Sequence, residues 1–183
     1  MHFKIVVFGV KEVSELLINY LIERDIKIDL IVSIDKSVLT KNHISGYKNL
    51  ENVANRNSIQ YFAVQNYSFE DNDDLNFFLC NDFDLGICHP WQRLIPKQVL
   101  DRFSFGIFGF HGSSFYLPKG KGRSPLNWSI IEGNKIIHNN LFRYVPTPDA
   151  GSIYSASDFE INEHDTIRTL EYKQLFDVKI QTL

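Results

Sequence analysis

The chain has 183 residues, of which 44% are hydrophobic and 22% are charged, and its net charge is −3. This balance predicts one globular domain over residues 1–183 with a sizeable core, and it excludes a second full domain. The acidic net charge excludes a general basic surface for a nucleic-acid backbone, so no nucleic acid is expected as a partner.

The first half of the chain alternates short apolar runs with amphipathic segments. Strands are predicted at residues 2–8, 26–34, 59–64, 83–88 and 105–110. Helices are predicted at residues 13–24, 47–57, 70–79 and 96–102, with a surface loop at 35–46. This alternation predicts an α/β fold, a Rossmann-like and mostly parallel sheet with helices on both faces and with 2–8 as its central strand.

Gly9 closes the first predicted strand, where a dinucleotide-binding loop would begin. The residues that follow, Val10 to Val13, lack the further glycines of a GxGxxG motif, so the backbone could not approach a pyrophosphate closely. The sequence therefore excludes a nicotinamide or flavin cofactor, and Gly9 is expected in a tight turn between strand and helix.

In the second half, a helix is predicted at 124–132, strands at 135–144 and 153–159, and a final helix at 165–176. The two cysteines, Cys80 and Cys88, lack the CxxC spacing of a metal site, and no reason appears to pair them. No metal is expected. Apolar stretches stay below about ten residues, so neither a membrane span nor a signal peptide is expected, and the expected location is cytoplasmic.

Two polar residues of the second half form a candidate catalytic pair. His111 is expected at the carboxyl end of strand 105–110, where sheets of this type place ligands, and His89 follows strand 83–88 in the same way. Asp149 lies in a Pro-Asp-Ala-Gly turn. A carboxylate close to His111 would orient the imidazole and favour its charged form, which can donate to a developing oxyanion. The pair predicts an active site, although neither residue does so alone.

A family resemblance becomes specific at these residues. The run from His111-Gly112-Ser113 through Leu117-Pro118-Lys119-Gly120-Lys121-Gly122-Arg123-Ser124-Pro125-Leu126-Asn127-Trp128, with Arg143-Tyr144-Val145 and Asp149-Ala150-Gly151-Ser152-Ile153, resembles the catalytic domain of 10-formyltetrahydrofolate-dependent formyltransferases. The most similar members act on amino groups of nucleotide-linked sugars in polysaccharide biosynthesis. Asp84 to Pro96 resembles the folate-side strand and loop of the family.

The resemblance implies a catalytic trio of Asn, His and Asp on a Rossmann-like sheet. His111 and Asp149 match two members, but Gly109 stands where the family has its Asn. Three explanations stay open: Asn127 or Asn139 replaces that amide, the subfamily works without it, or the chain is inactive. Two further departures are a longer segment at 113–118, which would reshape the acceptor entrance, and the expected absence of the accessory C-terminal domain of relatives.

The resemblance also assigns binding residues. Formyl-donor contacts are expected in the loop that starts at the end of strand 83–88, at Cys88, His89, Pro90, Trp91, Arg93 and Leu94. There main-chain groups would read the pterin and Trp91 would form an aromatic wall, unless its indole is a packing residue. Acceptor contacts are expected at Ser113, Lys119, Lys121, Arg123 and Asn127, with the three cations near phosphates unless they form only a solvated turn.

The leading hypothesis is an N-formyltransferase that moves the formyl group of 10-formyltetrahydrofolate to a nucleotide-linked amino sugar. In it, His111 stabilises the oxyanion, and Asp149 holds His111 and relays the proton of the amine. The partners expected are a small-molecule acceptor and a second copy in a homodimer, with neither nucleic acid nor membrane. Two alternatives remain: a methionyl-tRNA formyltransferase-like enzyme, and a non-catalytic binding protein for folate or nucleotide sugars.

Overall fold

The computed structural model describes residues 2–41 and 44–181, which form two compact units, Met1–Ile107 and Phe108–Leu183. The seven strands follow the order β3-β2-β1-β4-β5-β6-β7 in one mixed sheet, and strand β5 (Phe103–Ser113) runs from the first unit into the second. The predicted α/β fold with a mostly parallel sheet is confirmed, with two antiparallel strands at one edge.

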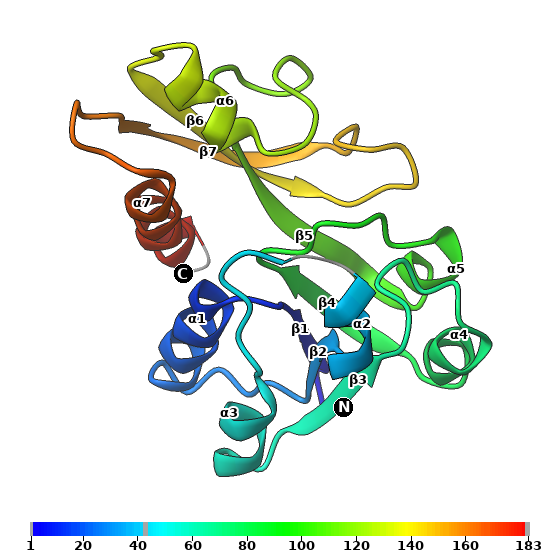
Figure 1. The fold of residues 1–183 in the computed structure, drawn as a ribbon. Helices are drawn as coiled ribbons and strands as arrows, with labels where there is room; N and C mark the ends of the chain where they lie inside the picture. The colour runs from blue at the N-terminus through cyan, green and yellow to red at the C-terminus, as the bar shows by residue number, and fades with distance from the viewer. Residues whose placement is uncertain (1, 42–43, 182–183) are drawn as a thin grey trace. The chain divides into compact units, whose positions relative to one another are not determined.

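The first unit contains the parallel part of the sheet. Its further elements are β1 (Ile5–Phe8), α1 (Glu12–Ile22), β2 (Leu30–Ile34), α2 (Lys36–Lys41), α3 (Glu51–Arg56), β3 (Gln60–Val64), α4 (Asn72–Leu79), β4 (Phe83–Cys88) and α5 (Lys97–Leu100). Strand β1 pairs in parallel with β2 and β4, and β2 pairs in parallel with β3. Helices α1 and α3 cover one face of these strands, and α4 and α5 cover the other (Figure 1).

Apolar side chains explain why these strands lie inside. All five residues of β2 are buried, as are the last three residues of β1, as expected for strands covered on both faces. Aromatic rings fill the space beside β1, where Phe8 stacks on Phe78 and meets the edge of Trp91. Asp71 caps helix α4 just before its first residue, and its carboxylate accepts the backbone N–H of Asp73 at 2.9 Å.

Gly9 connects β1 to α1 by close packing. A Cβ atom at position 9 would lie only 2.4 Å from Cβ of Ser14. The Ser14 hydroxyl donates to the carbonyl oxygen of His89 at 2.7 Å. The tight turn at Gly9 thus fixes the first residue of the loop that follows β4.

The second unit contains the antiparallel part. Besides the end of β5, it is built from α6 (Pro125–Ile131), β6 (Ile136–Arg143), β7 (Ile153–Glu160) and α7 (Ile167–Gln181). In the β5–β6 pair, Gly109 lies opposite Phe142 and His111 lies opposite Asn140. Leu126 of α6, Ile137 of β6 and Leu170 of α7 form a buried apolar cluster.

The sheet is confirmed, but β2 and α3 each start four residues later than predicted and α7 ends at Gln181 rather than 176; three other differences concern the arrangement. The loop predicted at 35–46 contains the helix α2 at Lys36–Lys41, while residues 42 and 43 lie outside the described residues. The middle strand of the seven is β4, whereas β1 lies one place away. Strand β5 continues to Ser113, because pairing with β6 satisfies its backbone groups beyond Phe110.

Within the described ranges, no helix combines the length and apolar character needed to span a bilayer.

Candidate active site

The sequence predicted His111 at the end of a strand that stops at residue 110. In the structure, His111 lies within β5, which continues to Ser113. Its side chain is 8% exposed, and its Nε2 atom lies 2.8 Å from the carbonyl oxygen of Gly120. A carbonyl oxygen only accepts hydrogen bonds, so Nε2 carries a proton and donates to Gly120. In the neutral ring, Nδ1 is therefore an acceptor with a free lone pair.

Asp149 lies in the turn between β6 and β7 and faces the same imidazole. Its Oδ1 atom lies 3.8 Å from Nδ1 of His111, and its Oδ2 atom accepts the backbone N–H of Gly122 at 3.1 Å. The backbone φ of Asp149 is 49°, a left-handed conformation that Asp tolerates better than most residues. The two predicted catalytic residues, far apart in the chain, therefore come together within the second unit.

Gly151 allows the turn of Asp149 to pack tightly. A Cβ atom at position 151 would lie 1.6 Å from the carbonyl oxygen of Arg143, the last residue of β6. The N–H of Arg143 donates to the carbonyl of Ser152 at 3.0 Å and closes the turn. Only a glycine fits this close backbone approach, which determines where Asp149 is held.

The loop between β5 and α6 contacts both members of the pair. Gly120 accepts from His111, and Gly122 donates to Asp149. The side chains of Lys119, Lys121 and Arg123 are exposed on this loop. Three cationic side chains thus lie on the segment that contacts His111 and Asp149.

Ser113 and Asn127 have different surroundings from those that the sequence suggested. Ser113 is 2% exposed, and its hydroxyl donates to the carbonyl of Phe115 at 2.6 Å, so it stabilises the start of the loop. Asn127 lies on α6 with an exposed side chain. The Ser113 hydroxyl therefore holds the loop at Phe115, whereas the Asn127 side chain is exposed on α6.

The side chain of Tyr144 fills the space beside Gly109. A Cβ atom at position 109 would lie 2.3 Å from Cε1 of Tyr144 and 2.5 Å from both Cζ and the hydroxyl oxygen. Residues 109 and 111 share one face of β5, because side chains alternate along a strand. The phenol end of Tyr144 therefore lies on the face that carries the His111 ring.

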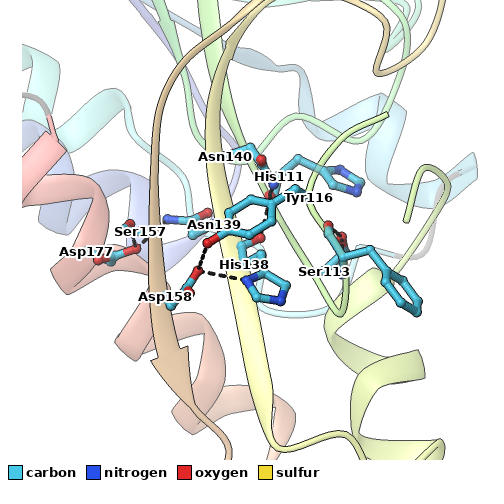
Figure 2. Close-up of polar contacts among 10 residues, drawn as sticks. His111, Ser113, Tyr116, His138, Asn139, Asn140, Ser157, Asp158 and Asp177 are labelled. Carbon is cyan, nitrogen blue, oxygen red and sulfur yellow. Dashed lines mark hydrogen bonds and ion pairs between the residues drawn. The ribbon is translucent and has the colours of Figure 1, made fainter. Parts of the chain in front are cut away.

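Asn139 does not replace the family amide, because its side chain lies on the face of the sheet opposite to that of His111, against α7. Its amide nitrogen donates to Asp177 of α7 at 2.9 Å, and its oxygen accepts from Gln174 of α7 at 3.0 Å. Asn139 thus anchors α7 to the sheet, together with the hydrogen bond between Ser157 and Asp177 (Figure 2). Asn140 donates to the backbone carbonyls of His111 and His138, both at 3.1 Å.

A second polar cluster, which the sequence analysis missed, joins the segment 113–118 to strands β6 and β7. The Tyr116 hydroxyl and Nδ1 of His138 each lie 2.8 Å from Oδ1 of Asp158 (Figure 2). The Tyr116 and His138 rings pack at a centroid distance of 4.1 Å. Burial raises the pKa of the Asp158 carboxyl, but the hydrogen bonds from His138 and Tyr116 outweigh it and hold that pKa below its ordinary value. Only the alternation of polar residues in the two strands could have indicated this cluster.

The residues predicted to bind the formyl donor lie in the first unit, at and after the end of β4. Cys88 is buried, and His89 is 4% exposed. Burial and the nearby charge of Lys11 lower the pKa of His89 to about 4, so its imidazole is neutral at physiological pH. Pro90 is half-buried, and Leu94 is 56% exposed.

Trp91 is a packing residue of this loop. Trp91 is 7% exposed, and its indole stacks on Phe69 and lies edge-to-face with Phe8 and Tyr67. The indole is thus packed among three aromatic rings, as the packing alternative expects. Arg93 lies over the Tyr67 ring at 5.4 Å. It also borders a hollow of about 200 Å³ that is lined by Val38, Gln65, Asn66, Tyr67, Ser68, Glu70 and Arg93.

No cluster of three or more His, Cys, Asp or Glu suited to a metal ion occurs among the residues that the structure describes. Residues 3–180 match the sequence model of the family described as formyl transferase. The chain therefore belongs to the formyl transferase family.

Known proteins similar to this chain differ in their acceptors. Methionyl-tRNA formyltransferase of Malacoplasma penetrans is 28% identical over 98% of this chain, which spans 56% of that protein. The chain spans about half the length, or less, of the curated relatives that it matches.

Solved structures show the same fold at low identity. Phosphoribosylglycinamide formyltransferase from Bacillus halodurans has a TM-score of 0.73 at 17% identity, with 96% of this chain and 89% of that chain covered. The N-formyltransferase from Helicobacter canadensis, solved with folinic acid and dTDP-3-aminofucose, has a TM-score of 0.63 at 18% identity, with 98% and 61% covered. These likenesses support the fold and leave the acceptor to be inferred.

Proposed function

We propose that this protein transfers the formyl group of 10-formyltetrahydrofolate to the amino group of a nucleotide-linked amino sugar. Membership of the formyl transferase family supports the reaction type. The observation that carries the proposal is the approach of His111 Nδ1 to within 3.8 Å of Asp149 Oδ1.

The reaction needs a group that removes a proton from nitrogen. A neutral amine attacks the formyl carbon, and the electron pair of the C=O bond moves to oxygen. The amine nitrogen then loses a proton, the C=O bond forms again, and the bond from carbon to N10 breaks while N10 gains a proton. One formamide and one tetrahydrofolate result, and no oxidant or reductant is involved.

His111 and Asp149 can take up that proton. When the imidazole is neutral with its proton on Nε2, His111 Nδ1 and Asp149 Oδ1 are two basic atoms that lie 3.8 Å apart. After attack, the amine nitrogen carries two N–H bonds. Two acceptors at this separation can each accept a hydrogen bond from one of them, and one of the two protons is then removed. Proton removal by such a pair accelerates transfer by about 100-fold to 10,000-fold.

The loop cations support an acceptor that carries phosphate. Lys119, Lys121 and Arg123 are exposed on the loop whose Gly120 and Gly122 contact the catalytic pair. Arg and Lys side chains bind phosphate oxygens through charged hydrogen bonds. A nucleotide diphosphate bound there would present a sugar amine to His111, which favours a small phosphorylated acceptor.

The loop after β4 is compatible with the formyl donor. Leu94 exposes apolar surface suited to a flat pterin, and the buried indole N–H of Trp91 has no hydrogen-bond partner among the described residues. Main-chain groups of residues 88–94 would supply the polar contacts. We place the donor there, where the guanidinium of Arg93 would pair with its carboxylates.

Methionyl-tRNA is the second candidate acceptor, because the Malacoplasma relative carries that name. The net charge of −3 argues against it, since tRNA binding requires many phosphate contacts. Four parallel incubations with 10-formyltetrahydrofolate decide between the candidates: dTDP-3-aminofucose, methionyl-tRNA, glycinamide ribonucleotide, and buffer alone. Release of tetrahydrofolate with only the amino sugar is expected. Release with only the tRNA would transfer the assignment, and no release with any amine would support the non-catalytic alternative.

A further inference from the structure

The catalytic pair of the proposed function lacks a donor for the oxyanion. The Nε2–H group of His111 donates to the Gly120 carbonyl at 2.8 Å, and Nδ1 faces the Asp149 carboxylate at 3.8 Å, so neither ring nitrogen points a free N–H at the formyl oxygen. Asp149 is a carboxylate and only accepts. Since an oxyanion in a site of this kind is stabilised by a donor placed in advance, another group on this face must supply one.

The asparagines near the pair are already committed elsewhere. Asn139 faces α7, where it bonds to Asp177 and Gln174. The Asn140 amide donates to two backbone carbonyls. Tyr144 is a further polar side chain on this face of β5, where its ring lies against Gly109.

We propose that the Tyr144 hydroxyl is the oxyanion donor of this protein, occupying the space that a side chain at position 109 would fill. Its oxygen lies 2.5 Å from the place of a Cβ atom at Gly109. That place is two residues, or about 7 Å, from the corresponding atom of His111 along the same face of the strand. A hydroxyl there and an imidazole at 111 can reach opposite sides of one formyl group.

Packing holds the Tyr144 ring in this position. The ring lies 5.1 Å from that of Phe142, which is the residue opposite Gly109 in the β5–β6 pair. Phe142 in turn meets the His111 ring edge-on at 6.4 Å. A donor fixed by neighbouring rings needs little reorganisation when charge develops, and this is the condition for strong stabilisation.

In the reaction, the hydroxyl donates a hydrogen bond and keeps its proton. Negative charge forms on the formyl oxygen as the amine attacks, and the hydrogen bond from Tyr144 strengthens. The charge returns to the C=O bond when N10 leaves. The proton lost by the amine still goes to the His111–Asp149 pair, so the proposal deepens the proposed function and rests on it.

The first test removes the hydroxyl alone. Tyr144→Phe retains the ring that fills the space beside Gly109, so the fold should persist. We expect kcat to fall by about 100-fold to 1000-fold, with KM for both substrates within about threefold of the original protein. Tyr154→Phe is the matched control, because Tyr154 is 60% exposed in the same unit and should leave kcat unchanged.

The second test exchanges the donor. Tyr144→Ala empties the space, and Gly109→Asn in that background places an amide where the phenol had been. The double variant should recover at least about tenfold of the kcat lost in Tyr144→Ala, whereas a purely structural role predicts no recovery.

The outcomes separate the two proposals. Turnover by the original protein with an unchanged kcat in Tyr144→Phe overturns this inference alone. A double variant no more active than Tyr144→Ala overturns it as well. Absence of turnover by the original protein with all three amines overturns the proposed function, and this inference with it.

Discussion

The carbonyl oxygen of Gly120 lies 2.8 Å from Nε2 of His111 and determines which ring nitrogen carries the proton. Gly122, on the same loop, donates to Asp149. One loop therefore sets both the tautomer of the histidine and the orientation of the carboxylate. The loop that carries the exposed cations is therefore also the loop that contacts His111 and Asp149.

The catalytic pair should be separable from the fold. His111→Asn and Asp149→Asn should each lower kcat by about 100-fold to 10,000-fold, because each removes one acceptor for the amine proton. Asp149→Asn retains an oxygen for the Gly122 N–H, so its unfolding free energy should change little. Steady-state kinetics with circular dichroism checks both, and His164→Asn, at an exposed site, is the control.

The loop cations should affect binding of the acceptor rather than chemistry. Lys121→Ala and Arg123→Ala should raise KM for a phosphorylated acceptor by about threefold to tenfold each, since each removes charged hydrogen bonds. Salt should raise KM of the original protein more than that of the double variant. Lys27→Ala, in the other unit and exposed, should leave KM unchanged. Equal KM values in all variants would remove the phosphate argument.

Gly109 and Tyr144 should show a strong energetic coupling. Gly109→Ala should lower the free energy of unfolding by about 1–3 kcal/mol, because its methyl group overlaps the Tyr144 ring. In the Tyr144→Ala background, the same substitution should cost much less. Urea unfolding of the four proteins measures this coupling. Additive free energies would show that the ring does not occupy the space beside Gly109.

His89 should make the protein less stable in acid. Its pKa is about 4 in the folded state and 6.5 when unperturbed, so the unfolded chain binds more protons between those values. The contribution is fully present above pH 6.5 and is lost as pH falls toward 4, by an amount on the order of 3 kcal/mol. Unfolding free energies at pH 7 and 4.5 measure it.

A variant and a spectroscopic measurement isolate His89 from the other histidines. His89→Gln should show a smaller loss of stability between pH 7 and 4.5 than the original protein. The ring protons of His89 should show no titration in NMR spectra above about pH 5. Titration near pH 6.5 would contradict the burial argument.

Local patterns were sufficient to predict most elements. Strand β4 has the predicted bounds, and α4 ends at Leu79 as predicted but starts at Asn72, two residues after the predicted start. The end of β5 and the antiparallel direction of β6 and β7 could not be predicted from periodicity, because they depend on pairing between distant segments. Helix α2 was missed because its six residues are mostly polar and carry no clear period.

The site divides in the same way. His111 and Asp149 could be predicted from their flanking glycines and prolines, but the role of Gly120 in fixing the tautomer needed coordinates. The contact between Tyr144 and Gly109 was not predicted, because the two residues lie far apart in the chain. One signal was present: a glycine inside a strand often marks a close approach by another group. For Trp91 the sequence left two readings open, since aromatic character alone cannot distinguish a binding wall from core packing, and the coordinates show a packed indole.

Transfer of a labelled formyl group tests the central claim most directly. The purified chain is incubated with 10-formyltetrahydrofolate carrying a ¹³C formyl carbon and with dTDP-3-aminofucose, and the product is followed by ¹³C NMR. The account predicts a ¹³C formamide on the sugar nitrogen with the original protein, and none with the His111→Asn/Asp149→Asn double variant. A label that stays on folate with the original protein, or that moves equally well with the double variant, would contradict it.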